Sequence, residues 1–141
     1  MTGSALTPEA DDLIARGRDI LAGVAEVAEA TKLYALAARE TYTAVLNAAR
    51  AIIRVRTGRV IKNHSGTHSE ISRLAHEDSR IDSTMVGFLA HGFELRSKFD
   101  YGGKPPPKYS QADALATVAE ARRLIDHAAA YLAICDLSPP Q

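Results

Sequence analysis

Hydrophobic residues recur every three or four positions along most of the chain, which is the spacing of one face of an α-helix. These intervals predict long helices over about residues 8–29, 31–57 and 83–99, and a further long helix that begins after Ser110. Residues at helical spacing are Leu13, Gly17, Ile20, Val24 and Val27 over 8–29, and Tyr34, Ala38, Tyr42, Val45, Ala49 and Ile52 on one face over 31–57. Met85, Leu89, Phe93 and Arg96 mark one edge of the helix over 83–99, and Leu115, Val118, Ile125, Ala129 and Leu132 form the apolar stripe of the last helix.

Local signals indicate where these helices begin and end. Thr7 followed by Pro8 is typical of a helix N-terminus, and Gly58 is expected to end the second helix. Thr67 and Glu70 have the spacing of a capping box, which predicts that a short third helix begins there. The stretch 100–108 contains two glycines and three consecutive prolines, so we expect it to be neither helical nor a central strand.

No segment alternates between apolar and polar residues with the period of two that a half-buried strand requires. The predicted fold is therefore all-α, an up-and-down bundle of four main helices plus one short helix. A chain of 141 residues fits a single domain over 1–141, with a core over about 8–135 and tails at 1–7 and 136–141.

The net charge, the cysteine count and the lack of long apolar segments limit the kinds of function that the protein can have. Lys plus Arg and Asp plus Glu both number 17, so any contact with nucleic acid must depend on local rather than net charge. Cys135 is the only cysteine, which excludes an internal disulfide and a cysteine-built zinc site. No signal peptide and no membrane span are evident, so we expect a cytoplasmic protein without membrane contact.

Basic residues gather in and after the second helix. A polar line along that helix is spaced at intervals of four, four, three and four, and no acidic residue lies between Thr41 and Ser69. Such a line is often no more than a solvated face. Without neighbouring acids, it also fits a surface that binds the phosphates of nucleic acid. The line consists of Arg39, Thr43, Asn47, Arg50 and Arg54, and the expected nucleic-acid-binding residues are Arg50, Arg54, Arg59 and Lys62.

The five histidines do not form a recognisable metal site. His64 and His68 are four residues apart, a spacing that can hold a metal ion on a helix. The pair spans the expected junction of a loop and a helix, and no third ligand is suitably spaced, so no metal and no cofactor are predicted. We expect His76, His91 and His127 to be surface or partly buried side chains with backbone partners.

The segment 93–103 is the richest in groups that can perform chemistry. Arg96 offers a donor fork suited to phosphate, Asp100 can orient that fork or accept a proton, and the hydroxyl of Tyr101 both donates and accepts. The alternative is that Arg96 and Asp100 pair to close the end of the fourth helix.

Four pieces of the sequence, in order, resemble the HEPN superfamily, specifically its small stand-alone prokaryotic members that are often encoded beside a minimal nucleotidyltransferase. They are residues 40–53 in the second helix, 62–66 before the short helix, 95–102 with their Leu-Arg and Asp-Tyr-Gly elements, and 112–132 in the closing helix. The resemblance implies a HEPN-like bundle that forms a homodimer, a nucleotidyltransferase partner, and metal-independent cleavage of RNA. In related toxins, the partner can attach AMP to a tyrosine close behind the motif, which here is Tyr101.

The sequence departs from the family pattern at its histidines. Arg96 is followed by Asp100 and Tyr101 and has no histidine within reach, and Asn47 occupies the second-helix position where histidine is common. Arg59 and His64 have the family's arginine-to-histidine spacing, but they lie before the short helix rather than before the closing one. We therefore expect a toxin–antitoxin or stress-response component that binds RNA or a nucleotide through Arg96, Asp100, Tyr101 and Asn47, with a degenerate ribonuclease activity. The alternative is a non-catalytic helical module that binds a nucleotide or another protein.

Overall fold

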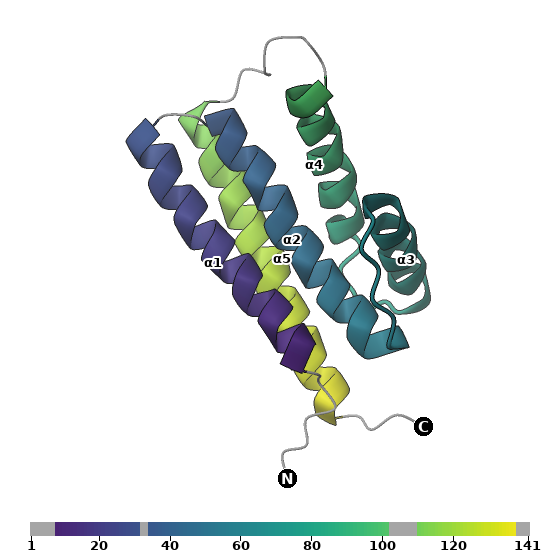
Figure 1. Ribbon diagram of the computed structural model, residues 1–141. Helices are drawn as coiled ribbons and strands as arrows, with labels where there is room; N and C mark the ends of the chain where they lie inside the picture. Colours follow the sequence, from purple (N-terminus) through teal and green to yellow (C-terminus); the bar gives the residue numbers. More distant parts are fainter. Residues whose placement is uncertain (1–7, 32–33, 102–109, 138–141) are drawn as a thin grey trace.

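In the computed structural model, the described residues form five helices and contain no strand (Figure 1). The structure describes the backbone of residues 8–31, 34–101 and 110–137, and within the helices it describes side chains except at 25, 27–31, 34–38, 95–101, 136 and 137. The helices are α1 (Pro8–Thr31), α2 (Tyr34–Thr57), α3 (His64–Glu77), α4 (Thr84–Tyr101) and α5 (Gln111–Leu137). The all-α prediction is confirmed.

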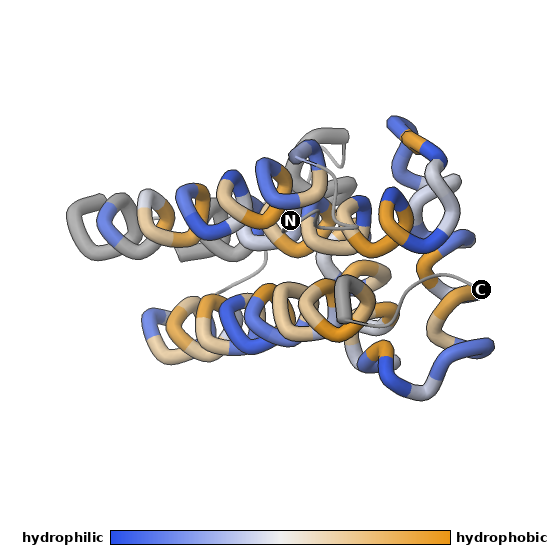
Figure 2. Tube along the Cα trace, turned by 90° about the horizontal axis from the view of Figure 1, so that it is seen from below, coloured by the Kyte–Doolittle hydropathy of each residue, from blue (hydrophilic) through white to orange (hydrophobic). Residues whose placement is uncertain are grey.

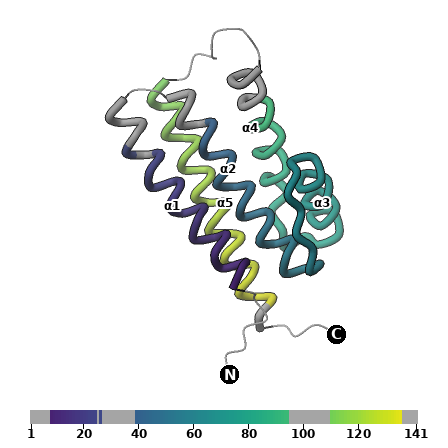
Figure 3. Tube along the Cα trace, viewed as in Figure 1, coloured from purple at the N-terminus to yellow at the C-terminus, as the bar shows by residue number. Residues whose placement is uncertain are grey.

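Helix α2 is the centre of the bundle. It contacts each of the other four helices, with α1 and α5 on one side and α4 and the short α3 on the other (Figures 1 and 3). The long helices α1, α2, α4 and α5 run in alternating directions, so α1 begins and α5 ends at the same end of the bundle. Consequently α2 is buried around most of its circumference, and Ala44, Val45, Leu46, Ala48 and Ala49 are all almost fully buried.

Small residues allow the helices to approach closely. A Cβ atom on Gly17 of α1 would lie 3.0 Å from the carbonyl oxygen of Ala44, and one on Gly92 of α4 would lie 2.8 Å from Cδ1 of Tyr42. Figure 2 shows hydrophobic and hydrophilic segments alternating along the helices, as amphipathic packing requires. On α5 the buried face is centred on Ala114, Val118 and Ala121, so Leu115 lies beside it and is 60% exposed, against the prediction.

Two helix ends confirm the local signals. Gly58 has φ of 74°, a left-handed conformation that glycine adopts without strain, and its N–H donates to the carbonyl of Arg54 at 2.9 Å, which ends α2. Before α5, the Ser110 hydroxyl accepts from the N–H of Asp113 at 3.0 Å, and the Asp113 carboxylate accepts from the N–H of Ser110 at 3.1 Å. This reciprocal pair is a capping box.

Two other ends differ from the predictions. Helix α3 begins at His64 rather than near Thr67, because the side chain of Asn63 caps it by accepting from the N–H of Gly66. Thr67 is therefore buried inside the helix, and its hydroxyl donates to the carbonyl of Asn63 at 2.8 Å. Helix α4 continues through Asp100 to Tyr101 instead of ending before them. Nothing in the sequence interrupts the helix before the glycine at 102.

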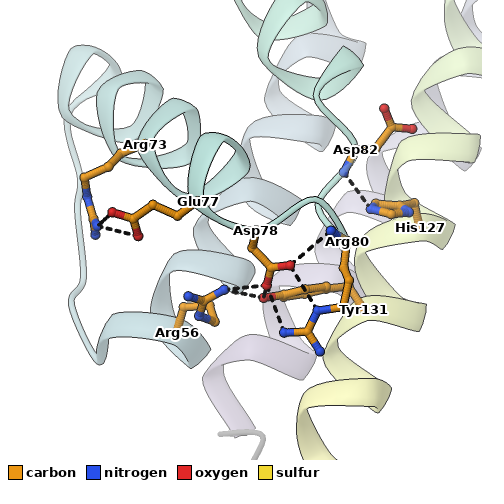
Figure 4. Close-up of polar contacts among 8 residues, drawn as sticks. All are labelled: Arg56, Arg73, Glu77, Asp78, Arg80, Asp82, His127 and Tyr131. Atoms are coloured by element: carbon orange, nitrogen blue, oxygen red, sulfur yellow. Dashed lines mark hydrogen bonds and ion pairs between the residues drawn. The ribbon is translucent and has the colours of Figure 1, made fainter.

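A polar cluster fixes the connection between α3 and α4 against the rest of the bundle (Figure 4). One carboxylate oxygen of Asp78 accepts from Arg56 of α2 at 2.7 Å and from the Tyr131 hydroxyl of α5 at 2.8 Å. Arg80 adds hydrogen bonds from its backbone and guanidinium to the same carboxylate, and it lies over the ring of Tyr131. Nearby, His127 accepts from the backbone N–H of Asp82 at 2.9 Å, which confirms the prediction of a backbone partner.

In the part of the chain that the structure describes, no helix is both long and apolar enough to cross a membrane.

Candidate nucleic-acid interface

A pocket of about 390 Å³ opens where α1, α2 and the segment after Gly58 meet. Because Gly58 turns the chain at the end of α2, the next residues return alongside that helix and form one wall of the pocket. The N-terminal half of α1 forms the opposite wall. The lining residues are Glu9, Asp12, Leu13, Arg16, Asn47, Arg50, Arg54, Arg59, Val60, Ile61 and Lys62.

All the basic residues predicted to bind nucleic acid meet in this pocket. Arg50, Arg54, Arg59 and Lys62 line it together with Asn47. Arg16 of α1 is a fifth cationic side chain, and nothing in the sequence groups it with the other four. The pocket also holds two carboxylates, Glu9 and Asp12, and five cations against two anions leave an excess of three positive charges.

Arg50 is held in place by the segment that leads into α3. Its Nη2 donates to the carbonyl of Lys62 at 2.6 Å, and its Nε donates weakly to the Thr67 hydroxyl at 3.4 Å. Burial lowers the pKa of the Arg50 guanidinium, and the neighbouring Tyr42 raises it by less. Arginine remains protonated at any physiological pH, so Arg50 is a fixed positive charge in the pocket wall.

Arg54 contributes a donor that is not satisfied by the described residues. Its Nη1 donates to the carbonyl of Gly58, whereas its Nε is buried and makes no hydrogen bond within the described part of the chain. A buried donor without an acceptor costs about 1–3 kcal/mol. An acceptor on a ligand bound in the pocket would remove that cost.

One of the basic residues of the pocket is neutralised by an acidic residue from outside the acid-free stretch of the sequence. Arg59 forms an ion pair with Glu70 of α3 at 3.1 Å, and the side chain of Glu70 is only 8% exposed. Glu70 also binds Arg73, and these two arginines lower the pKa of its carboxyl, with the hydrogen bonds from Arg73 contributing most. Glu70, which lies eleven residues after Arg59 in the sequence, therefore reaches it from α3. Lys62 and Arg16 make no ion pair with any described residue.

A second constellation of functional groups lies between α2, α3 and α4. His64 and His68 both belong to α3 rather than spanning a loop and a helix, and both bind the buried hydroxyl of Tyr42. The Tyr42 oxygen lies 2.7 Å from Nδ1 of His64 and 2.8 Å from Nε2 of His68. Phe93 of α4 packs against the cluster, with its ring centroid 5.6 Å from that of each histidine.

The sequence alone does not predict this histidine cluster. The spacing of His64 and His68 is visible in the sequence, but the helical spacing of Tyr42 indicates only a core position, and its two partners lie 22 and 26 positions away. Arg59 and His64, which have the arginine-to-histidine spacing of the family motif, bind different partners. Arg59 binds Glu70, and His64 binds Tyr42. Within the described residues, no three His, Cys, Asp or Glu side chains are grouped so that they could hold a metal ion.

The other expected site residues lie at the C-terminal end of α4. Arg96, Asp100 and Tyr101 all have helical backbone, and Arg96 and Asp100 are four residues apart, which places them on one face. Their side chains lie outside the described residues. The fourth member of that predicted group, Asn47, lines the basic pocket.

Compared with models of known protein families and with curated proteins, the amino-acid sequence gives no match. Function must therefore be inferred from the chemistry of the residues themselves.

Proposed function

We propose that this protein binds RNA or a nucleotide, and that the pocket between α1, α2 and the segment after Gly58 holds the phosphate groups. The observation that carries this proposal is the assembly of five cationic side chains in one pocket of a chain whose net charge is zero. Local charge of this kind is what recognises phosphate when net charge cannot.

The individual side chains suit different parts of that task. Arg50 is already oriented by Lys62 and Thr67, so binding a phosphate would cost it little conformational entropy. Lys62 is exposed and can follow the ligand, and Arg16 approaches from α1. The carboxylates of Glu9 and Asp12 discourage a ligand that is anionic throughout and favour one that also offers hydrogen-bond donors, as the bases and sugars of nucleotides do.

The resemblance to the HEPN superfamily extends this proposal to a biological setting. On that reading, the protein is a homodimeric component of a toxin–antitoxin or stress-response module, with a minimal nucleotidyltransferase as its partner. Arg96, Asp100 and Tyr101 would form the family's polar motif, and Tyr101 would be the residue that the partner modifies with AMP. The ordered match of four sequence pieces supports this setting.

Binding is tested by fluorescence anisotropy with a labelled single-stranded RNA of twelve nucleotides, with AMP as a competitor. The decisive variant is Lys62→Gln, because this side chain lines the pocket while the hydrogen bond to Arg50 uses only the Lys62 backbone. Losing one contact between a cation and a phosphate should weaken binding about tenfold, equivalent to roughly 1.4 kcal/mol. It should also reduce the slope of log K against log salt by about 0.7.

The matched control is Arg122→Gln, which removes the same charge from an exposed position on α5 outside the pocket. Its affinity should stay close to that of the wild type. Equal weakening in both variants would mean that RNA is attracted by charge in general and that the pocket is not the site. If the wild type binds neither RNA nor AMP, the proposed function is wrong and the alternative of a helical module that binds another protein is favoured.

A further inference from the structure

The two ends of the basic pocket differ in their chemistry. Helices α1 and α2 run in opposite directions, and a Cβ atom on Gly17 of α1 would lie 3.0 Å from the carbonyl oxygen of Ala44 of α2 (Figure 1). These two positions are therefore level with each other. At a rise of about 1.5 Å per residue, Glu9 lies about 12 Å from this level along α1, and Arg54 lies about 15 Å from it in the same direction along α2. Glu9 and Arg54 thus lie at one end of the pocket.

The opposite end of the pocket is cationic. Arg16 lies about 10 Å from Glu9 along the same face of α1. Lys62 is held toward this end, because its carbonyl accepts from Arg50 at 2.6 Å and Arg50 lies one turn closer to this end than Arg54 does. Arg16 and Lys62 form no ion pair with any described residue, so both charges are available to an anion.

The Glu9 end combines an acceptor, free donors and an apolar surface. The carboxylate of Glu9 is exposed and forms no ion pair with any described residue. A guanidinium has five N–H donors, and Arg54 gives one of them to the carbonyl of Gly58. Val60, on the wall opposite α1, is apolar and yet 67% exposed. This end therefore suits a flat ring that carries both donors and acceptors on its edge.

Among the nucleobases, guanine matches a carboxylate beside an arginine best. Its N1–H and its exocyclic amine are adjacent donors, which the two oxygens of one carboxylate can accept together. Its O6, next to N1, is an acceptor for an arginine. Adenine has one amine beside the bare acceptor N1, so it can give the carboxylate only one hydrogen bond. Cytosine and uracil likewise have no two adjacent donors.

We propose that the pocket selects guanine mononucleotides. The phosphate lies at Arg16 and Lys62. The edge of guanine lies between Glu9, which accepts from N1–H and the amine, and Arg54, which donates to O6. Asp12, which lies between Glu9 and Arg16 on the same face of α1, then faces the ribose, whose hydroxyls can donate to it. The inference rests on the proposed function, since the cations must hold the phosphate, and it favours a mononucleotide over RNA because the two carboxylates repel further phosphates.

The test is isothermal titration calorimetry of the full chain with GMP, IMP, AMP and guanosine. GMP should bind about tenfold more tightly than AMP, because AMP lacks one hydrogen bond to a charged group. IMP keeps N1–H and O6 but has no exocyclic amine, so its affinity should lie between those of GMP and AMP. Guanosine, without a phosphate, should bind more weakly than GMP.

The variant Glu9→Gln tests whether the carboxylate reads the base. An amide has one acceptor oxygen and adds donors, so it cannot accept both N–H groups of guanine, and the GMP-to-AMP affinity ratio should fall to about one or below. The control Asp11→Asn removes the other acid in the first turn of α1, which lies outside this pocket, and should leave the ratio unchanged. Because the ratio compares two ligands on one variant, a loss of folded protein lowers both apparent affinities alike and does not alter it.

The same titrations distinguish the two proposals. If GMP, IMP and AMP bind equally and all more tightly than guanosine, the pocket holds phosphate without reading the base, so the guanine assignment is refuted and the proposed function stands. An unchanged GMP-to-AMP ratio in Glu9→Gln, or an RNA of twelve adenylates that binds more tightly than GMP, would also refute the assignment alone. If GMP binds no more tightly than guanosine, or if nothing binds, both proposals fail together.

Discussion

Replacing Asp78 by asparagine should destabilise the protein far more than replacing any exposed acid. The Asp78 side chain is only 9% exposed and forms the centre of the cluster that joins α2, the α3–α4 connection and α5 (Figure 4). Its carboxylate accepts hydrogen bonds from three side chains, those of Arg56, Tyr131 and Arg80. An asparagine amide offers only one acceptor oxygen and would turn an NH₂ group toward these donors.

The expected size of the effect follows from the environments of the three partners. Arg80 is 52% exposed, so its ion pair contributes little. The hydrogen bond from Tyr131 is part-buried, and the ion pair joins Arg56, which is 29% exposed, to the 9% exposed Asp78 side chain. Breaking such an arrangement by removing the carboxylate costs about 3 kcal/mol, the lower end of the range for buried pairs. For a chain of this size, Asp78→Asn should lower Tm by about 10 °C.

The measurement is urea unfolding and thermal unfolding followed by circular dichroism. Asp126→Asn is the matched control, because it removes a carboxylate from the exposed Arg18–Asp126 pair, whose side chains are 49% and 60% exposed. That variant should lose less than about 1 kcal/mol. Our reasoning is refuted if the two variants are equally stable or if Asp78→Asn unfolds at the same urea concentration as the wild type.

The pH dependence of the same variant provides an independent check. Hydrogen bonds from Arg80 and then from Tyr131 hold the pKa of the Asp78 carboxyl well below its usual range, although burial opposes them. A group whose pKa is lower in the folded state stabilises the fold above its unfolded pKa, which is about 3.9 for aspartate, and loses that effect as the pH falls further. The difference in stability between wild type and Asp78→Asn should thus be constant above about pH 5 and shrink below about pH 4.

Three further predictions concern packing, capping and assembly. Gly92→Ala should cost about 1–3 kcal/mol, measured by urea unfolding, because its Cβ would lie 2.8 Å from Tyr42 unless α4 moves; unchanged stability would show that α4 moves freely. Asn63→Ala should cost about 1 kcal/mol by loss of the α3 cap, whereas Asn63→Asp should retain most of the stability, and equal loss in both variants would contradict a capping role. Light scattering should give twice the 15.1 kDa of one chain if the protein is a homodimer, and a mass near 15.1 kDa at tens of micromolar would contradict that proposal.

The helices could be predicted from the sequence because their signals are local. Hydrophobic spacing, the glycine after α2 and the Ser110–Asp113 cap each involve residues within about one turn of one another. The errors at helix ends came from competing local signals. Thr67 and Glu70 had capping-box spacing, but Asn63 lies earlier and caps α3 first.

The candidate sites depended on contacts between helices, which no local spacing encodes. The clustering of Arg50, Arg54, Arg59 and Lys62 was predictable in part, since they are close in sequence, but the contribution of Arg16 and the two carboxylates required α1 to pack beside α2. The pairing of Arg59 with Glu70 likewise depends on where α3 lies.

Tyr42 illustrates the difference most clearly. Its helical spacing correctly predicted that its ring is buried, because burial follows from the apolar face of α2. Its hydroxyl meets His64 and His68 only because α3 packs across that face, and Gly92 lets α4 approach the ring from another side. The sequence thus determined which residues form helices and which side chains face inward. Only the tertiary structure decided which polar groups meet there, since hydrogen bonds between distant residues depend on how the helices pack.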